Sequence, residues 1–589
     1  MLKAKRRKGT QMVKKVLLIF KTHLDIGYTD LSKNVADRYF NEFIPKAIEI
    51  GYALKNSDTP FIWTVGSWLV WEGLKRDHDG SLERALRDGI ISWHALPFTM
   101  HTEIMSGKLF DYGLSLSKRL DKRFGVKTIA AKMTDVPGHT AAIVPHLAQA
   151  GVKLLHIGVN SACPVPNVPE IFRWKHGSSE ITVIYNGGYG LDTVIGDTAV
   201  VFGHTNDNLG PQSCEEVKTL YKEMESRYPG AEIRAATLND AADAVDAVPP
   251  SLFPVFDGEI GDTWIYGMAS DPKKLAGFRE LQRYYDSIET DKELDDSLLC
   301  VPEHTWGLNI QTNLRDREHW FLKDFEPLRE TLGSRLEASW KEQRDYVTLA
   351  GKALNKDPWE ALKFEIPVRK PTSQSLNEAP PARVFCQLFD QRDNERYLKK
   401  YIKLPEVEWA NWDFTKYGLP TEYTGGSFDA EIKDAWIDGD KKVWKCDFDS
   451  VIKERHGLPT VYIECSGKYI SIKTTGKKCD RMPQALWVKF DMIMGQIEIN
   501  KMGEWTDVSK AAGNPLLSGF YSGIRDENTE LISYDCGLVA PFGPHLYDFM
   551  PVDLTPDPTF CLYNNCWNTN FPMWFQDDMN FRFEIKKIA

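Results

Sequence analysis

The feature that most constrains this sequence is an alternation of short apolar runs with helical patterns over residues 15–255. Val16–Phe20, Phe61–Val65 and Ile90–Ala95 are apolar runs of strand length, and helical segments such as Glu215–Tyr228 follow or separate such runs. Strands that alternate with helices predict a mainly parallel sheet covered by helices. Folds of this kind place their functional residues at the carboxyl ends of the strands. We therefore expect an α/β fold with its chemistry where the apolar runs end.

Two regions with different patterns follow. Residues 274–294 and 316–355 have helical spacing with few breakers, which predicts a helical bundle. A Pro- and Ser-containing stretch at 370–381 predicts a linker. Short strand patterns separated by turn residues then predict an antiparallel β-sandwich. The predicted organisation is a disordered tail at 1–14, an α/β domain at 15–265, a helical bundle at 266–368 and a β-sandwich at 369–589.

Composition narrows the classes of partner. The net charge is −11 and the one basic run is Lys3–Lys8, whereas a nucleic-acid footprint needs clustered Lys and Arg, so no nucleic-acid partner is predicted. No apolar run approaches the roughly 20 residues of a membrane span, and the start lacks the features of an export signal. The ten cysteines form no CxxC pair, which predicts reduced thiols, no thiolate zinc site and a cytoplasmic location. The oligomeric state stays open, a homo-oligomer included.

A histidine and an aspartate follow the first apolar run directly. The segment Lys21–Tyr28 reads KTHLDIGY. In an extended segment His23 and Asp25 point to the same face, because side chains alternate with period two. One imidazole and one carboxylate at this spacing form half of a zinc or manganese site. A His–Asp hydrogen bond that shapes a turn is the alternative, and spacing alone leaves both open.

A second candidate carboxylate ends another apolar run. The segment Met133–Thr140 reads MTDVPGHT, so Asp135 follows the run Lys127–Met133 and precedes a Pro-Gly break. A carboxylate at a strand end before a sharp turn is well presented to a cleft. Capping of the next helix is an ordinary alternative for such a residue.

Taken together, the two motifs resemble those of the glycoside hydrolase family 38 α-mannosidases. That family carries a His-x-Asp-x-Gly-aromatic motif on its first strand and an Asp-Pro-Phe-Gly-His-Ser motif that bears its nucleophile. Here the matching segments are His23–Tyr28 and Asp135–Thr140, in the same order. The resemblance covers about residues 15–310. It implies that the α/β domain is an irregular barrel of the glycoside hydrolase and deacetylase type.

The resemblance also implies a role for each matched residue. His23 and Asp25 would bind one divalent metal ion, with zinc first and manganese or calcium as alternatives. Asp135 would contact the metal and attack the anomeric carbon, and Tyr28 would pack against a sugar face. A retaining mechanism needs a second carboxylic acid to protonate the leaving oxygen. Asp207 falls where the family supplies that acid, and a loop aspartate that forms an Asx-turn is the alternative.

The fourth metal ligand departs from the family pattern. Where the family has a histidine, residues 258–267 contain Asp262 and no histidine. Asp262 is therefore the expected fourth ligand, and a site richer in carboxylate admits manganese or calcium more readily. His304, in the segment PEHTWG, is the alternative ligand. The change leaves mannose specificity and the retaining mechanism open.

Further residues are expected to contact the substrate. His101 and Glu103 follow the third apolar run, where they could hydrogen-bond sugar hydroxyls or form an ordinary surface loop. His204 precedes the candidate acid, and His304 and Trp306 share one loop. The predicted function is metal-dependent hydrolysis of glycosidic bonds in oligosaccharides or glycosides. A carbohydrate lyase, a deacetylase-like hydrolase and a non-catalytic carbohydrate-binding protein are the alternatives, because a shared fold does not fix the reaction.

Overall fold

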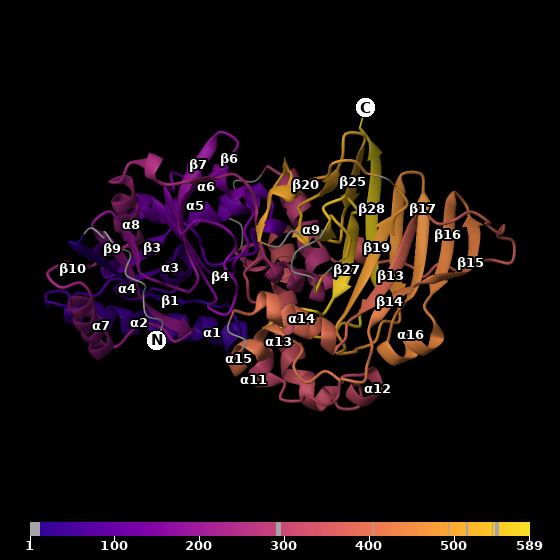
Figure 1. The fold of residues 1–589 in the computed structure, drawn as a ribbon, viewed down its shortest axis with the longest axis horizontal. Helices are drawn as coiled ribbons and strands as arrows, with labels where there is room; N and C mark the ends of the chain where they lie inside the picture. The colour runs from indigo at the N-terminus through magenta and orange to yellow at the C-terminus, as the bar shows by residue number, and fades with distance from the viewer. Residues whose placement is uncertain are drawn as a thin grey trace.

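The computed structural model describes residues 12–289, 296–403, 406–492, 494–513, 516–544, 546–547 and 553–588. The chain forms an α/β region, a set of helices and a β-rich region, in that order along Figure 1. The α/β class is therefore confirmed. The basic run at residues 3–8, and with it most of the predicted tail, lies outside the described residues.

One sheet of the α/β region contains the strand that precedes the first motif. Its strand order is β3-β2-β1-β9-β8, and β10 also pairs with β1. The strands are β1 (Lys15–His23), β2 (Trp63–Gly66), β3 (Ile91–His94), β8 (Thr193–Ile195), β9 (Thr198–Asp207) and β10 (Glu232–Ala235). All these pairs except β8–β9 are parallel. In the β1–β9 register His23 lies opposite Asp207, so both residues end their strands at the same sheet edge.

A second sheet of this region contains the strand that carries Asp135. Its order is β11-β6-β7-β5-β4, formed by β4 (Ala130–Asp135), β5 (Leu154–Val159), β6 (Ile171–His176), β7 (Ser179–Asn186) and β11 (Val255–Phe256). The pairs β4–β5 and β5–β7 are parallel. The backbone N–H of Ala95, just after β3, donates to Ala130 O at 2.9 Å, which brings β4 beside β3. The sequence predicted an irregular α/β barrel; the described strands of this region form these two sheets, and a closed barrel is not shown.

The helices of this region are α1 (Ser32–Arg38), α2 (Ile44–Leu54), α3 (Ser67–Lys75), α4 (Ser81–Arg87), α5 (Gly107–Phe124), α6 (Ile143–Gln149), α7 (Cys214–Arg227) and α8 (Leu238–Asp246). Between α1 and α2 lies a π-helical turn at Tyr39–Phe43. This turn lets Pro45 occupy the first turn of α2, where its missing N–H costs nothing. The turn also carries Tyr39, which contacts the first motif as described below.

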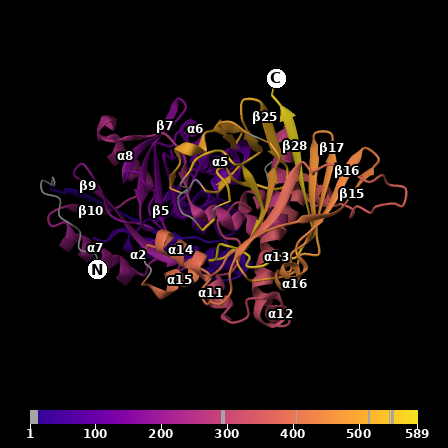
Figure 2. The ribbon, with the colours of Figure 1, turned by 45° about the vertical axis from the view of Figure 1, so that its right-hand side comes forward.

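The middle of the chain is helical, with α9 (Pro272–Ser287), α10 (Ser297–Cys300), α11 (Ile310–Asn313), α12 (Leu322–Phe325) and the long α13 (Arg329–Leu354). Both α9 and α10 pack against α13. Residues 316–328, expected to continue one long helix, instead hold the short α12 before α13 begins. Figure 2 shows α13 beside the β-rich region, so this helix joins the two halves of the molecule.

The β-rich region has two antiparallel sheets. One has the order β14-β13-β19-β27-β26-β23 and the other β15-β16-β17-β18-β28-β25-β24-β20-β21. The first contains β13 (Ala382–Leu388), β14 (Gly426–Asp429), β19 (Gln484–Phe490), β23 (Ser518–Gly519), β26 (Leu538–Ala540) and β27 (Thr559–Asn564). The second contains β15 (Glu431–Asp438), β16 (Lys441–Asp447), β17 (Thr460–Ser466), β18 (Tyr469–Thr475), β20 (Glu498–Lys501), β21 (Glu504–Thr506), β24 (Gly523–Arg525), β25 (Thr529–Ser533) and β28 (Met579–Lys587). Apolar side chains of both sheets share one buried cluster.

Two helices of the β-rich half extend to the α/β region. They are α14 (Gln391–Tyr401) and α15 (Glu408–Phe414), and Figures 1 and 2 both place them between the two regions. The Tyr401 hydroxyl at the end of α14 donates to Asp262 Oδ1 at 2.9 Å. The C-terminal half therefore contributes side chains to the surroundings of the α/β strand ends.

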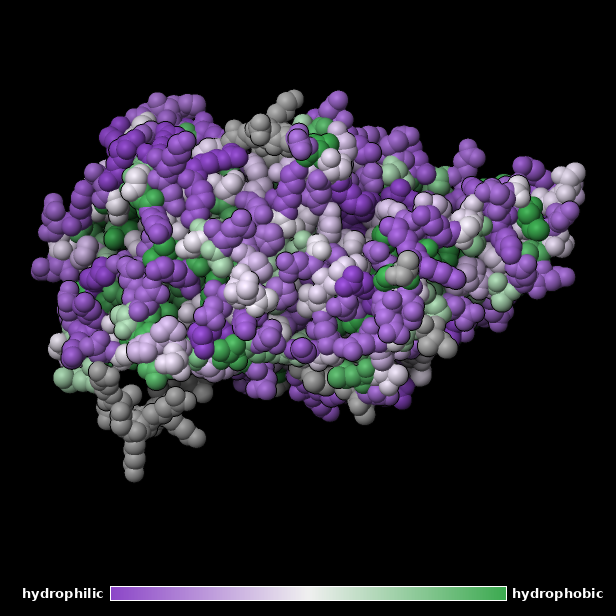
Figure 3. Space-filling model, turned by 90° about the horizontal axis from the view of Figure 1, so that it is seen from above, coloured by the Kyte–Doolittle hydropathy of each residue, from purple (hydrophilic) through white to green (hydrophobic). Residues whose placement is uncertain are grey.

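The surface and the thiols add two observations. Figure 3 shows hydrophilic residues over most of one face, with hydrophobic residues scattered among them. Within the described ranges, no helix has the length and apolar character needed to cross a membrane. All ten cysteines are free thiols.

Candidate metal centre

Three buried side chains bring metal-ligand atoms together at the carboxyl end of β1. His23 Nε2, Asp25 Oδ1 and His304 Nε2 all lie within 4.8 Å of one another. The two Nε2 atoms are 3.2 Å apart. Asp25 Oδ1 is 3.2 Å from His23 Nε2 and 2.9 Å from His304 Nε2. Among the described residues these three side chains form the one group of its kind, here called the metal group.

The shape of this triangle fits a bound cation. Two donors at about 2.0 Å from a tetrahedral metal ion are about 3.3 Å apart, close to the observed separations of 2.9 and 3.2 Å. Two imidazole nitrogens at this distance repel each other unless a proton or a cation lies between them. Asp25 Oδ2 is also buried and has no hydrogen-bond partner among the described residues. The donor set therefore fits a divalent metal ion.

The loop after β1 is fixed by an asparagine from the loop after β9. Asn208 Nδ2 donates to the carbonyl oxygens of Asp25 and Gly27, each at 3.1 Å, and Asn208 Oδ1 accepts from the Asp25 N–H at 3.0 Å. The Tyr39 hydroxyl, in the π-helical turn, donates to His23 O at 3.1 Å. These bonds hold His23 and Asp25 in place through their backbone.

His304 reaches the group from a loop far along the chain. Its backbone N–H donates to Thr99 O at 3.2 Å, which ties this loop to the end of β3. Its Nδ1 lies 2.7 Å from Glu303 Oε1, on the side of the ring opposite to the metal group. A carboxylate behind a ligating imidazole orients the ring and raises its basicity. The neighbouring residue thus prepares His304 to act as a ligand.

The ionisation of this group is strongly perturbed. Burial alone would raise the pKa of Asp25, but the charge of His23 and the hydrogen bonds from both histidines outweigh burial and hold that pKa well below its usual range. Burial alone would lower the pKa of His304, but Glu303 and Asp25 raise it well above its usual value. The group therefore strongly favours a positive charge at its centre.

Asp135 stands beside the group in a strained conformation. Its φ of 81° lies in the left-handed region, which costs energy for a residue other than glycine and is often found at functional sites. Its Oδ1 accepts from the Tyr189 hydroxyl at 2.5 Å and from Asn160 Nδ2 at 3.1 Å. Its Oδ2 lies 3.7 Å from His304 Nε2. The next helix, α6, is capped at Ala142 without a side-chain bond, so Asp135 does not serve as its cap.

Two further carboxylic acids lie close enough to the aspartates of this site for their charges to interact. Burial, with the charges of Asp25 and Asp135, raises the pKa of Asp207 to about 7. Burial also raises the pKa of Asp413, at the end of α15, to about 7, and the charges of Asp207 and Asp135 contribute to this shift. Both acids can therefore hold a proton near neutral pH beside the ionised Asp25.

Asp262, the expected fourth ligand, lies elsewhere. Its Oδ1 accepts from the Tyr401 hydroxyl, and its Oδ2 accepts from the Trp264 N–H at 2.9 Å, where it caps a 3₁₀ helix. Burial raises the pKa of the Cys163 thiol well above its usual value, and the charge of Asp262 raises it further. The structure groups His304 with His23 and Asp25, and does not group Asp262 with them.

The residues expected to contact substrate fall into two sets. Tyr28 is half-buried in the left-handed region, and its hydroxyl accepts from Asn309 Nδ2 beside Asp413. His204 is exposed near the ring of Tyr189, with 5.8 Å between ring centroids. Burial lowers the pKa of His101 well below its usual value, and the charge of nearby His304 lowers it further.

Glu103 and Trp306 are used structurally instead. The Glu103 carboxylate pairs with Lys501 and accepts from the Gly519 N–H at 3.1 Å, which ties it to the β-rich half. Trp306 is buried, and Lys274 Nζ covers its ring at 3.8 Å from the centroid. Both side chains are buried in these contacts.

The sequence prediction did not include Tyr189, Asp413 or Glu303. Tyr189 follows Gly187 and Gly188, which indicated only a flexible stretch, yet its ring lies 4.9 Å from that of His23. Asp413 follows the predicted linker, where nothing indicated a return to the first region. Glu303 could have been found, because a carboxylate next to a candidate histidine ligand is a common arrangement.

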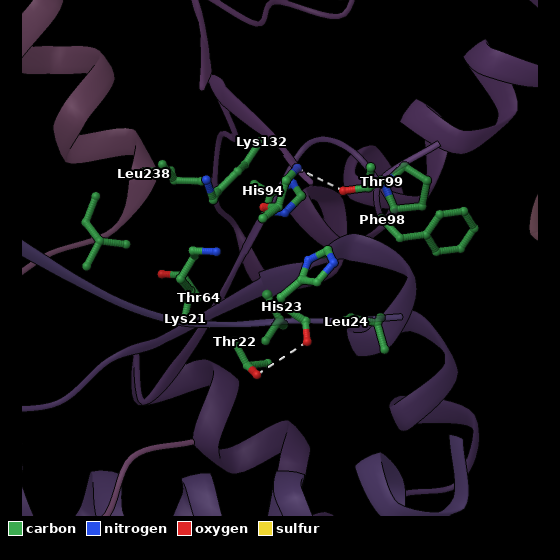
Figure 4. Close-up of a pocket in the computed structure, with 15 residues that line it drawn as sticks. Lys21, Thr22, His23, Leu24, Thr64, His94, Phe98, Thr99, Lys132 and Leu238 are labelled. Carbon is green, nitrogen blue, oxygen red and sulfur yellow. Dashed lines mark hydrogen bonds between the residues drawn. The ribbon is translucent and has the colours of Figure 1, made fainter. Parts of the chain in front are cut away.

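A small pocket adjoins the metal group from within the α/β region. It is lined by His23 and by buried polar side chains that include Lys21, His94 and Lys132, as Figure 4 shows. Burial lowers the pKa of Lys21 to about 7, although Asp207 and Asp135 act to raise it. The strand ends therefore carry an acidic group and a basic pocket side by side.

Comparison with known proteins extends these observations. A family model for a domain of unknown function (DUF5054) matches residues 268–380. No curated protein matches the sequence. The fold is similar to that of an alpha-mannosidase from Enterococcus faecalis V583, with a TM-score of 0.56 and 9% identity over 98% of this chain and 87% of that chain. It is also similar to a glycosyl hydrolase family 38 protein from Enterococcus faecalis, with a TM-score of 0.52 and 9% identity over 98% of this chain and 86% of that chain. At this identity the likeness concerns the fold.

Proposed function

We propose that this protein is a metal-dependent glycoside hydrolase, α-mannosidase-like in mechanism, that acts on oligosaccharides or glycosides. The observation that carries the proposal is the buried group of His23, Asp25 and His304 with Asp135 beside it. The likeness of the fold to a solved alpha-mannosidase and to a solved glycosyl hydrolase family 38 protein supports this assignment.

His23, Asp25 and His304 would hold the metal ion, with Asp135 completing the set. Two imidazoles among the donors favour zinc, then manganese, over calcium, which prefers oxygen ligands. His304 thus takes the place that the sequence analysis gave to Asp262. When bound, the ion would supply positive charge that holds adjacent sugar hydroxyls and so positions the ring for an oxocarbenium-like transition state.

Asp135 is the proposed nucleophile. Tyr189 and Asn160 hold its Oδ1, so that Oδ2 faces the metal group. The carboxylate attacks the anomeric carbon and forms a glycosyl ester while the bond to the leaving oxygen breaks. Water then cleaves the ester and regenerates the free carboxylate. The two bonds to Asp135 Oδ1 fix the direction of attack.

Asp207 is the proposed acid and base. Its raised pKa of about 7 keeps a proton available for the leaving oxygen near neutral pH. After that transfer the Asp207 carboxylate takes a proton from the attacking water. Asp207 ends β9 opposite His23, and the charges of Asp25 and Asp135 raise its pKa, so it lies near the same group. This position supports hydrolysis over a purely carbohydrate-binding role.

The test combines metal analysis with a panel of nitrophenyl glycosides. We expect about one metal ion per chain and release of nitrophenol from at least one α-glycoside. Asp135→Asn keeps the shape of the side chain and should reduce turnover by about a thousandfold or more, because it removes the nucleophile. Asp262→Asn is the matched control and should keep its activity. Full activity of Asp135→Asn, or no hydrolysis by metal-loaded wild type across the panel, would contradict the proposal.

A further inference from the structure

We infer, resting on the proposed function, that the basic pocket beside the metal group binds a carboxylate of the substrate, so that the sugar acted on is a hexuronic acid. The four basic or polar side chains that define this pocket, here called the lysine pocket, are Lys21, His94, Lys132 and Thr64.

The lysine pocket is continuous with the metal group. Lys21 lies two residues before His23 on β1, so both side chains point to the same face, one below the other. Thr64 on β2, His94 on β3 and Lys132 on β4 line the same cavity, and Figure 4 shows them around His23. A sugar held by His23 and its partners therefore lies next to the pocket.

Lys21 has unused donors inside the pocket. Its side chain is buried, and its Nζ has no hydrogen-bond partner among the described residues. His94 is also buried, and its Nδ1 has no hydrogen-bond partner among the described residues. Buried polar atoms without partners are rare, and a native one calls for a ligand or another explanation. Both atoms belong to residues that line one cavity.

Lys132 is held as a hydrogen-bond donor by a chain of neighbours. His156 Nε2 lies 2.8 Å from Asn186 Oδ1, an acceptor, so the ring carries its hydrogen on Nε2. The His156 Nδ1 lone pair then accepts from Lys132 Nζ at 2.5 Å, and Tyr189 O accepts at 3.3 Å. Burial lowers the pKa of Lys132 well below its usual value. An anionic ligand in the pocket would favour the charged form, which has one further N–H to donate.

The pocket lacks a negative partner of its own. Within the described part of the chain, no carboxylate oxygen pairs with Lys21 or Lys132 within 4.0 Å. Asp135 and Asp207 act on Lys21 only from beyond 4.0 Å. A buried ammonium without a counter-charge is costly, so an anion supplied by the substrate completes the pocket.

The size of the pocket suits a small anionic group such as a carboxylate. Its volume is about 40 Å³. At about 10–15 Å³ for each water-sized sphere, this is room for about three such spheres. A carboxylate has three heavy atoms, whereas a sulfate or phosphate group has five.

Isothermal titration calorimetry of the metal-loaded full chain tests the inference. The probes are D-mannuronate against D-mannose and D-glucuronate against D-glucose. In at least one pair we expect the uronate to bind about tenfold or more tightly, because charged hydrogen bonds are strong. Lys21→Met should lose this preference and retain its metal. Lys477→Met, which changes a buried lysine of the β-rich half, should keep the preference.

The outcomes separate this inference from the proposed function. Equal binding of both members of each pair by wild type, or an unchanged preference in Lys21→Met, would overturn the carboxylate pocket even if neutral glycosides are hydrolysed. Lys21 would then act only as a counter-charge for Asp135 and Asp207. Loss of the proposed function would instead show as a wild-type protein without metal. The wild-type comparison does not depend on whether Lys21→Met folds.

Discussion

Two buried clusters, one in each half of the molecule, pair histidine with aspartate in different ways. In the α/β region His23, Asp25 and His304 direct two imidazole nitrogens and one carboxylate oxygen at the same point. In the β-rich region His456 Nδ1 lies 2.7 Å from Asp480 Oδ2, and His456 Nε2 lies 3.3 Å from the Tyr423 hydroxyl. Both clusters are inaccessible to solvent or nearly so.

The difference lies in whether the hydrogen-bonding capacity is filled. Asp480 also accepts from Gln484 Nε2 at 3.3 Å and from the Met482 N–H at 3.4 Å, so the second cluster is complete without a ligand. In the first cluster Asp25 Oδ2 lacks a partner among the described residues and the two Nε2 atoms face each other. Buried polar groups are normally satisfied, so the first cluster indicates a ligand and the second indicates structure.

The largest expected difference between the two clusters is in catalysis, which depends on the surroundings of the first cluster alone. Asp207→Asn should lower turnover by about a hundredfold to ten-thousandfold, because it removes the general acid. Since the acid must be protonated and the pKa of Asp207 is raised to about 7, wild-type activity should fall as pH rises through about 7. Initial rates measured from about pH 5 to about pH 9 follow this decline, because this range brackets the pKa of the acid. A decline that persists unchanged in Asp207→Asn would assign it to another group, with Asp413 first.

The second cluster should respond in stability instead. His456→Ala removes one partner of a buried pair and should lower the free energy of unfolding by about 3–5 kcal/mol. Its metal content and its turnover per folded chain should match wild type. Denaturant unfolding with parallel metal analysis measures both quantities. Loss of metal in this variant would remove the distinction between the two clusters.

Two residues of the first cluster and the neighbouring Asp135 could be predicted from the sequence, whereas the place of His304 in the cluster could not. An apolar run closely precedes each of His23, Asp25 and Asp135. The rule that functional residues follow the carboxyl ends of strands therefore identified them. His304 reaches the group only because its loop bonds back to Thr99, a contact that local patterns do not contain.

The same reasoning applies to the fold and to the residues that were missed. The alternation of strands and helices predicted the α/β class, whereas the division into two sheets depends on pairings between distant strands. Asp413 reaches the site from α15, an element of the half that was expected to be only a sandwich. Asp262 looked like a ligand by its position in sequence, but Tyr401 and the Trp264 N–H already satisfy it.

A smaller effect tests that reading of Asp262. Burial raises its folded-state pKa from 3.8 to about 7, so the folded protein holds this proton more tightly than the unfolded chain. The wild type should therefore lose stability, by a few kcal/mol at about 1.4 kcal/mol per pKa unit, as pH rises from about 4 to about 7. Asp262→Asn should remove that decline and keep its metal. Thermal unfolding at several pH values measures this, and an unchanged pH dependence would contradict the reading.

The smallest expected effect concerns Tyr189. Tyr189→Phe removes one hydrogen bond to Asp135 Oδ1 and keeps the ring against His23. Its turnover should fall by about fivefold to tenfold, which corresponds to about 1 kcal/mol. Steady-state kinetics measure the change. A loss as large as that of Asp207→Asn would mean that Tyr189 takes part in proton transfer.

The most direct test of the central claim is the metal content of three proteins by elemental analysis: wild type, His304→Ala and His456→Ala. Both variants remove a buried histidine beside an aspartate, and only the first removes a proposed ligand. We predict about one metal ion per chain in wild type and in folded His456→Ala, and little or none in His304→Ala. Equal metal content in the two variants would contradict the metal centre described here.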